Sequence, residues 1–303
     1  MVKKVLKFVV PTLLLGFLVF NIAQDWPNIL PYIGKLNVVP LFLSFIVLLT
    51  VYPQGAFGWY LILKNNNIKT KPYEAVRIWI ISNTARYIPG KVWQYVGRVE
   101  MARDAGIARN FAISSLLLEI FLVLLAGLCV SILALPFINL GNFHISYWVF
   151  LVAVPLILIH PTVSNWFIEL IAKFTKKEIK KFALTLSFGS TLNILIWFSI
   201  NFLLNGLALS FLIKALGREV GIMDFFMYSG FYSISWVLGF VSLIAPAGVG
   251  VSEVSLAYLL SLSGVPLTLA SAIALIYRFL ITVAEILVFL FVLKFTGNKH
   301  DES

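Results

Sequence analysis

The chain has 303 residues, of which 60% are hydrophobic and only 12% are charged, and its formal net charge is +10. Soluble domains contain about 45–50% apolar and about 25% charged residues, so this composition excludes a soluble globular protein and indicates one membrane domain over residues 1–303. The excess of Lys and Arg lies in short segments between apolar blocks, which is typical of cytoplasmic loops and excludes a nucleic-acid-binding surface.

The first two apolar blocks predict membrane-spanning helices. Lysines at positions 3, 4 and 7 precede an apolar run, and a good cleavage site is missing after it, so we expect a retained first helix at about 5–23. A second helix is predicted at about 38–62, followed by a lysine-rich stretch that marks the cytoplasmic side. This pattern places the N-terminus in the cytoplasm.

Residues 73–100 are too apolar for an ordinary loop and too charged and broken for a lipid-facing helix. Breaks in the backbone at membrane depth are tolerated only where they face protein or a water-filled cavity. We therefore predict a re-entrant element: a half-helix to about Arg86, a break at Pro89 and Gly90, and a second half-helix that returns to the cytoplasmic face. Three arginines are predicted to lie on that face: Arg98, Arg103 and Arg109.

The rest of the chain predicts further spans. The expected helices lie at about 111–135, 146–170, 182–213 (long enough to be tilted or interrupted), 222–245 and 267–294. A Pro/Gly-rich break and a short apolar segment predict a second re-entrant element at about 246–263, and a cytoplasmic tail follows at 295–303. The expected fold class is therefore an all-α, polytopic transmembrane bundle of about seven to nine helices with two re-entrant or broken-helix elements.

The two breaks suggest an internal repeat. Each of them, at 89–90 and at 246–250, is followed within about ten residues by a glutamate, Glu100 or Glu253. Paired interrupted helices in the two halves of a chain are typical of transporters built from inverted repeats. An inverted pseudo-repeat is thus one interpretation, and ordinary helix kinks that coincide by chance are the other.

Charges inside the apolar blocks need a physical reason, because each costs about 2.5–3.5 kcal/mol on membrane-insertion scales. They can pair with one another and hold the bundle together, or they can line a polar cavity for a charged substrate. The two interpretations are compatible, since a cavity needs counter-charges when it is empty. The set comprises three bases and three acids: Arg86, Lys91, Arg278, Glu119, Glu253 and Glu285.

The breaks also favour anion binding. A half-helix that begins at Gly90, or between Gly248 and Gly250, presents unpaired N–H groups and the positive end of the helix dipole. Arg86 and Lys91 next to such an end would complete a site for an anion, and the commonest anion in a membrane is a lipid phosphate.

Other patterns in the sequence say less about a functional site. Four residues spaced four apart form a ladder on one helix face: Asn193, Trp197, Asn201 and Asn205. We predict that they make interhelical hydrogen bonds, and the less favoured interpretation is that they line a polar cavity. The single cysteine, Cys129, is predicted to be a buried hydrophobe. Neither a P-loop nor an aspartate-rich motif occurs, so we expect no nucleotide, metal or other cofactor.

Two motifs together resemble a known family. The first is Arg86-Tyr87-Ile88-Pro89-Gly90-Lys91-Val92-Trp93, followed by Gly97-Arg98, Ala105-Gly106 and the stretch 116–119. The second is Pro246-Ala247-Gly248-Val249-Gly250-Val251-Ser252-Glu253, followed by Gly264-Val265-Pro266 and Tyr277-Arg278. In order and spacing they resemble the signatures of the lysylphosphatidylglycerol synthase transmembrane family, also called flippase-like, over about residues 70–290. Lys91 and Ser252 depart from the family pattern, which puts the choice of headgroup in doubt.

The resemblance implies a multi-pass bundle in the cell membrane, with both termini cytoplasmic by loop charge, that moves a lipid or lipid-linked headgroup between leaflets. The aminoacyl transfer of longer members is not carried over, because the soluble domain for it is missing from this sequence. The substrate-binding set is then expected to be Arg86, Gly90, Lys91, Arg98, Glu119, Gly248, Gly250, Glu253, Arg278 and Glu285.

In this interpretation the bases hold a phosphate, and the acids balance them or bind a cationic part of the headgroup. Two alternatives stay open. One is a membrane enzyme that transfers a group to a lipid headgroup, with Glu119 or Glu253 as general base. The other is a non-transporting subunit of an envelope glycan or lipid pathway. Expected partners are a membrane phospholipid or lipid-linked substrate, and a second copy of the chain or envelope enzymes.

Overall fold

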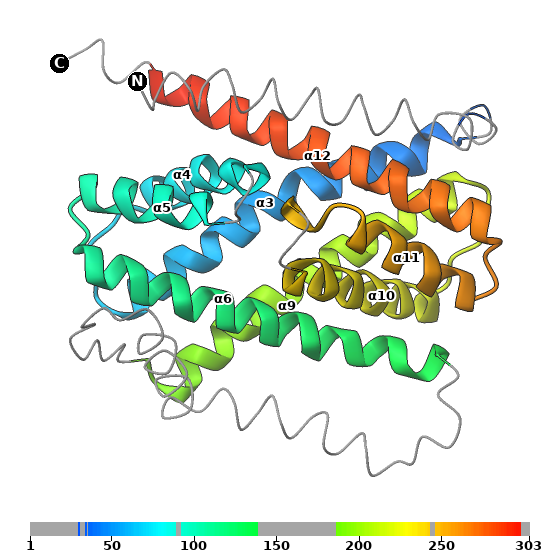
Figure 1. The fold of residues 1–303 in the computed structure, drawn as a ribbon, viewed down its shortest axis with the longest axis horizontal. Coiled ribbons are helices and arrows are strands. Elements are labelled where there is room, and N and C mark those ends of the chain that lie inside the picture. Colours follow the sequence, from blue (N-terminus) through cyan, green and yellow to red (C-terminus); the bar gives the residue numbers. More distant parts are fainter. Residues whose placement is uncertain are drawn as a thin grey trace.

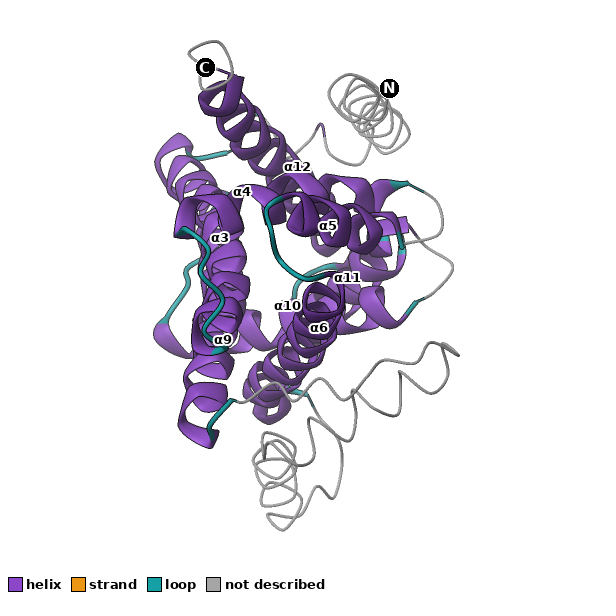
Figure 2. Ribbon diagram, turned by 90° about the vertical axis from the view of Figure 1, so that its left-hand side faces the viewer, coloured by secondary structure: helices purple, strands orange, loops and turns teal. Residues whose placement is uncertain are grey.

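A computed structural model describes residues 36–88, 92–138, 186–242 and 246–297, together with Leu30 and Gly34. These residues form eight α-helices and three short 3₁₀ helices, joined by short loops and without a strand (Figures 1 and 2). The predicted all-α bundle is therefore confirmed. The helices predicted at 5–23 and 146–170 lie outside the described residues.

Both halves of the described chain contain the same succession of elements: a 28-residue helix, a shorter helix, a break, a 12-residue helix and a second long helix. In the first half these are α3 (Val38–Asn65), α4 (Pro72–Asn83), η2 (Thr84–Tyr87), α5 (Trp93–Asp104), α6 (Arg109–Ser131) and η3 (Ile132–Phe137). In the second half they are α9 (Phe188–Ala215), α10 (Ile222–Val241), η4 (Pro246–Gly248), α11 (Val251–Leu262) and α12 (Leu267–Gly297).

The turns between these helices repeat as well. Two residues beyond the ends of α3 and α9 lie residues with positive φ, Asn67 at 60° and Gly217 at 84°. The links from α5 to α6 and from α11 to α12 each contain a glycine with positive φ, Gly106 at 85° and Gly264 at 82°. Glycine and asparagine adopt this left-handed conformation at little cost, and such residues commonly end helices. The sequence thus encodes the same turn at equivalent places in both halves.

The central contact of the bundle joins the two long helices α3 and α9 in antiparallel orientation. The N–H of Asn37 donates to the carbonyl of Ala215 at 2.8 Å, and Gln54 Nε2 donates to the carbonyl of Trp197 at 2.7 Å. The two helices therefore run in opposite directions along their contact. A two-fold axis that relates antiparallel helices must run perpendicular to them.

The remaining helix contacts occur in equivalent pairs, one for each half of the chain. α6 packs on α9 and α10, and α12 packs on α3 and α4. The two halves thus form an inverted repeat, as the paired breaks predicted. The two glutamates that follow the breaks, Glu100 and Glu253, do not occupy equivalent positions in the repeats, however. Glu253 is the third residue of α11, and the third residue of α5 is Tyr95.

Two helical hairpins, α4–α5 and α10–α11, enter this bundle from opposite ends (Figure 1). Their breaks meet in the interior, where η2 contacts η4. α4, α5 and α11 have 12 residues each, about 18 Å at 1.5 Å per residue, and thus cannot cross a hydrocarbon core of about 30 Å. Within the described residues, the stretches long and apolar enough to cross it are Val38–Asn65, Arg109–Phe137, Phe188–Ala215 and Leu267–Lys294.

The contact between α9 and α10 depends on glycine. A Cβ at Gly206 would lie 2.5 Å from the Cα of Ser229, so a side chain there would force the two backbones apart. We expect Gly206→Ala to lower the stability of the protein by about 1–3 kcal/mol, the usual range for overpacking, and to lower its Tm in detergent. Gly189→Ala on the same helix is the control, because a Cβ at Gly189 meets no atom within 4 Å. Equal Tm values for the two variants would contradict the close packing of α9 and α10.

Candidate functional site

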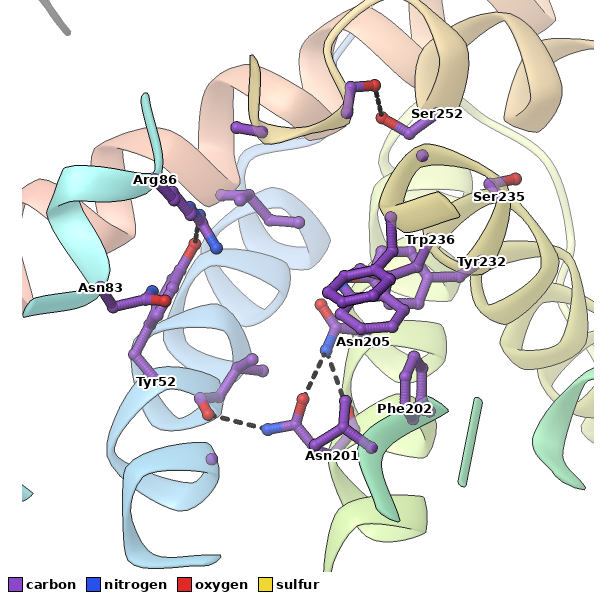
Figure 3. Close-up of a pocket in the computed structure, with 18 of the residues that line it drawn as sticks. Tyr52, Asn83, Arg86, Asn201, Phe202, Asn205, Tyr232, Ser235, Trp236 and Ser252 are labelled. Atoms are coloured by element: carbon purple, nitrogen blue, oxygen red, sulfur yellow. Dashed lines mark hydrogen bonds between the residues drawn. The ribbon is translucent and has the colours of Figure 1, made fainter. Parts of the chain in front are cut away.

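A cavity of about 500 Å³ lies where the two hairpin tips meet the long helices (Figure 3). Its volume is within the range of about 300–1,000 Å³ found for small-molecule sites. All helices of both halves except η3 contribute lining residues. Six of the predicted site residues line this cavity: Arg86, Arg98, Glu119, Gly248, Glu253 and Arg278.

Arg86, in the 3₁₀ turn after α4, ties the first hairpin to the last helix. Its Nη2 lies 2.5 Å from Oε2 of Glu285 on α12 and donates to the hydroxyl of Tyr52 at 3.0 Å. Glu285 also accepts hydrogen bonds from the hydroxyl of Tyr87 at 2.7 Å and from Nδ2 of Asn83 at 3.4 Å. The Glu285 side chain is only 4% exposed, whereas that of Arg86 is 23% exposed. The carboxylate is therefore enclosed by donors, and part of the guanidinium faces the cavity.

Arg278 on α12 pairs with Glu253 at the start of α11, with Nε and Oε1 3.3 Å apart. Oε2 of Glu253 accepts hydrogen bonds from the N–H of Gly250 at 2.7 Å and from Oγ of Ser252 at 3.1 Å. The prediction that the Gly250 N–H is open to an anion is therefore wrong, because the carboxylate three residues later caps the helix start. Gly250 itself is exposed, and it is not among the cavity-lining residues.

Gly248 allows the second break to lie close to α10. A Cβ at Gly248 would lie 2.9 Å from the carbonyl oxygen of Gly239, and its φ of 72° also favours glycine. The side chain of Arg278 reaches the same break, since Nη2 lies 3.5 Å from the carbonyl oxygen of Ala247. The glycine thus brings the backbone of η4 to the cavity wall.

Arg98 pairs with Glu119, and this pair is buried. Nη1 of Arg98 lies 2.6 Å from Oε2 of Glu119, Nε donates to Ser82 Oγ at 3.1 Å, and Trp79 Nε1 donates to Glu119 Oε1 at 2.6 Å. The Arg98 side chain is 3% exposed. The prediction that Arg98 lies on the cytoplasmic face is therefore wrong. Arg103 and Arg109, which were predicted beside it, are on the surface, with side chains 54% and 58% exposed.

Three of the four ladder residues on α9, Trp197, Asn201 and Asn205, make the interhelical hydrogen bonds that their spacing predicted, whereas Asn193 is exposed. Nδ2 of Asn201 donates to the carbonyl of Val51 at 2.8 Å, and the hydroxyl of Tyr277 donates to the carbonyl of Asn205 at 2.8 Å. Asn201 and Asn205 line the cavity as well, so both interpretations hold for them (Figure 3).

An aromatic wall opposite the arginines was not predicted. The Trp236 and Phe240 rings stack with their centroids 5.3 Å apart, and the Phe202 and Trp236 rings make a T-shaped contact with their centroids 5.2 Å apart. Tyr232, one turn earlier, also lines the cavity. The spacing 232, 236, 240 could have revealed this face of α10, because residues four apart share a helix face. Two other predicted site residues, Gly90 and Lys91, lie outside the described part of the chain.

Fold and site together define an α-helical, polytopic membrane protein with inverted repeats and a charged cavity between two broken helices. The chain belongs to the family described as "Lysylphosphatidylglycerol synthase TM region", whose sequence profile matches residues 4–288. It is therefore a membrane protein related to lipid modification or flipping. No curated protein and no solved structure matches the chain.

Proposed function

We propose that this protein is a lipid flippase that moves a phospholipid or lipid-linked headgroup with an anionic phosphate between the two leaflets. The observation that supports this proposal most directly is the cavity at the meeting point of two hairpins that enter from opposite ends. In transporters with inverted repeats, the substrate site lies at the repeat interface and is formed by discontinuous helices.

The charges of the cavity favour a phosphate. Arg86 and Arg278 keep 23% and 22% of their side chains exposed, although each already has a carboxylate partner. A guanidinium can bind a carboxylate at one edge and phosphate oxygens at another, because it has five N–H donors in one plane. In this proposal Arg86 and Arg278 hold the phosphate, aided by Lys91 and the backbone at Gly90 and Gly248. The buried pair of Arg98 and Glu119 holds α5 against α6.

The repeat supplies a mechanism for alternating access. The α3–α9 contact joins the halves through hydrogen bonds along its length, while each hairpin tip contacts the cavity from one end only. Movement of one hairpin and its neighbours about this contact would open the cavity to one leaflet, and movement of the other hairpin would open it to the opposite leaflet.

Loop charge assigns an orientation to this proposal. The loops α3–α4 and α5–α6 lie at one end of the bundle, together with the last turn of α12. Positive charges gather there and mark that end as cytoplasmic: Lys64, Lys69, Lys71, Arg103, Arg109 and Lys294.

The proposal is tested with purified protein in liposomes that contain a trace of phosphatidylglycerol with a fluorescent headgroup-proximal label. In protein-free liposomes dithionite bleaches about half of the label, because only the outer leaflet is accessible. We expect bleaching well beyond half in liposomes with the protein. Bleaching that stays at half for every anionic and zwitterionic lipid tested would contradict the proposal. Mass spectrometry of the same lipids would then reveal a covalently altered species if the protein is a headgroup transferase.

A further inference from the structure

The ion pair of Glu253 and Arg278 differs from the other two pairs in the cavity region. Its atoms are 3.3 Å apart, compared with 2.5 Å for Arg86 and Glu285 and 2.6 Å for Arg98 and Glu119. Oε1 of Glu253 is buried and makes no hydrogen bond to any residue in the described part of the chain. Among the described residues, Arg278 is therefore the group whose charge stabilises this oxygen.

A phosphate bound at the other edge of the Arg278 guanidinium shares the charge of this arginine, so Oε1 of Glu253 loses much of its counter-charge even where Nε still faces it. The carboxylate of Glu285 does not depend on its arginine in this way. Tyr52, Tyr87 and Asn83 still donate hydrogen bonds to it when Arg86 binds a ligand. A buried carboxylate without a counter-charge is costly, and such groups become neutral by taking up a proton.

Among the described residues around Glu253, no other basic side chain replaces the charge of Arg278. Arg86 and Tyr87 belong to η2, which contacts η4, and Arg86 and Tyr232 line the same cavity as Glu253. Tyrosine is neutral, and Arg86 is already bound to Glu285. The backbone N–H of Gly250 and the hydroxyl of Ser252 bind Oε2, so they leave Oε1 as the atom that loses its partner.

We propose that binding of an anionic phosphate at Arg278 is coupled to the uptake of one proton by Oε1 of Glu253. The empty site carries Arg278 as a cation and Glu253 as an anion; the loaded site carries the arginine cation, the lipid phosphate anion and a neutral carboxylic acid. The net charge of the site is zero in both states, with one lipid anion and one proton bound together. This inference rests on the proposed function, and it makes a proton gradient a driving force for lipid movement.

The test measures proton uptake on lipid binding in detergent, and therefore needs no transport. A short-chain phosphatidylglycerol is added to the purified protein in weakly buffered solution with a pH indicator, and its binding is followed by tryptophan fluorescence. We expect about one proton per bound lipid for the wild-type protein and none for Glu253→Gln. The glutamine can still cap Gly250, because its amide oxygen accepts the same hydrogen bond. Glu100→Gln is the matched control, since Glu100 pairs with arginines on the surface.

The pH dependence of the affinity gives a second readout. If one proton binds with the lipid, the Kd of the wild-type protein rises by up to tenfold per pH unit as the solution becomes more basic. The Kd of Glu253→Gln should stay constant over the same range. Lipid binding without proton uptake would overturn this inference alone, as would equal pH dependence in both proteins. Absence of binding for every phospholipid at every pH would overturn it together with the proposed function.

Discussion

Replacement of Arg86 by alanine is expected to reduce lipid translocation in liposomes by about 10–100-fold. The guanidinium offers charge-assisted hydrogen bonds to a phosphate, each worth about 1.5–3 kcal/mol, and its side chain is 23% exposed to the cavity. The rate of dithionite bleaching of fluorescent phosphatidylglycerol measures this loss. Arg86→Lys should retain part of the activity, since a lysine keeps the charge but loses the planar set of donors.

Two further variants separate this effect from misfolding. The double variant Arg86→Ala/Glu285→Gln removes both charges of the pair, and the glutamine can still accept hydrogen bonds from Tyr52 and Tyr87. It should elute as a monodisperse protein and remain inactive. Arg103→Ala is the matched control at an exposed arginine and should transport normally. Wild-type rates in a folded Arg86→Ala protein would exclude Arg86 from the substrate path.

Replacement of Arg98 by methionine is expected to destabilise the protein by about 3–5 kcal/mol. The change leaves the carboxylate of Glu119 buried without a counter-charge, and removal of one partner from a buried ion pair costs this much. Thermal unfolding in detergent measures the loss as a lower Tm. The double variant Arg98→Met/Glu119→Gln should recover most of the Tm, since its glutamine is neutral and can still accept the hydrogen bond from Trp79.

Arg109→Met serves as the control for this pair, because its side chain is 58% exposed and surface ion pairs contribute at most about 1 kcal/mol. A Tm for Arg98→Met equal to that of Arg109→Met would contradict the structural role of the buried pair. A double variant no more stable than Arg98→Met would show that the guanidinium contributes through its packing on Trp79 rather than through its charge.

Much of the fold could be predicted because the patterns that encode it are local. Apolar blocks of suitable length gave α3, α6, α9 and α12, and Pro/Gly-rich segments marked both breaks. The two turn glycines of the repeat, Gly106 and Gly264, belong to the same local code. Glu100 and Glu253 both follow a break within about ten residues, but equivalence in the repeat depends on the position within each helix, and there the two glutamates differ.

The pairing of charges could not be predicted in the same way. The sequence supplied a set of acids and bases, but which arginine meets which glutamate depends on how helices rotate against each other. Arg98 was expected beside Arg103 and Arg109, yet on α5 it faces inward to Glu119 of α6. The N–H of Gly250 was expected to be open, yet the nearest carboxylate along the chain caps it. In both cases a side chain of the protein itself is the partner of the group that was expected to be open.

The repeat of the backbone is not a repeat of the charges, and this has a consequence for the transport cycle. By position in the helices, Tyr95 occupies the place of Glu253, and Ile120 occupies the place of Arg278. Arg86–Glu285 joins the two halves, whereas Arg278–Glu253 lies within one of them. In the proposed transport cycle, the inward-facing and outward-facing empty states therefore differ in free energy, although their backbones are related by symmetry. Without substrate, the protein is thus expected to populate mainly the state whose cavity is open to one of the two leaflets.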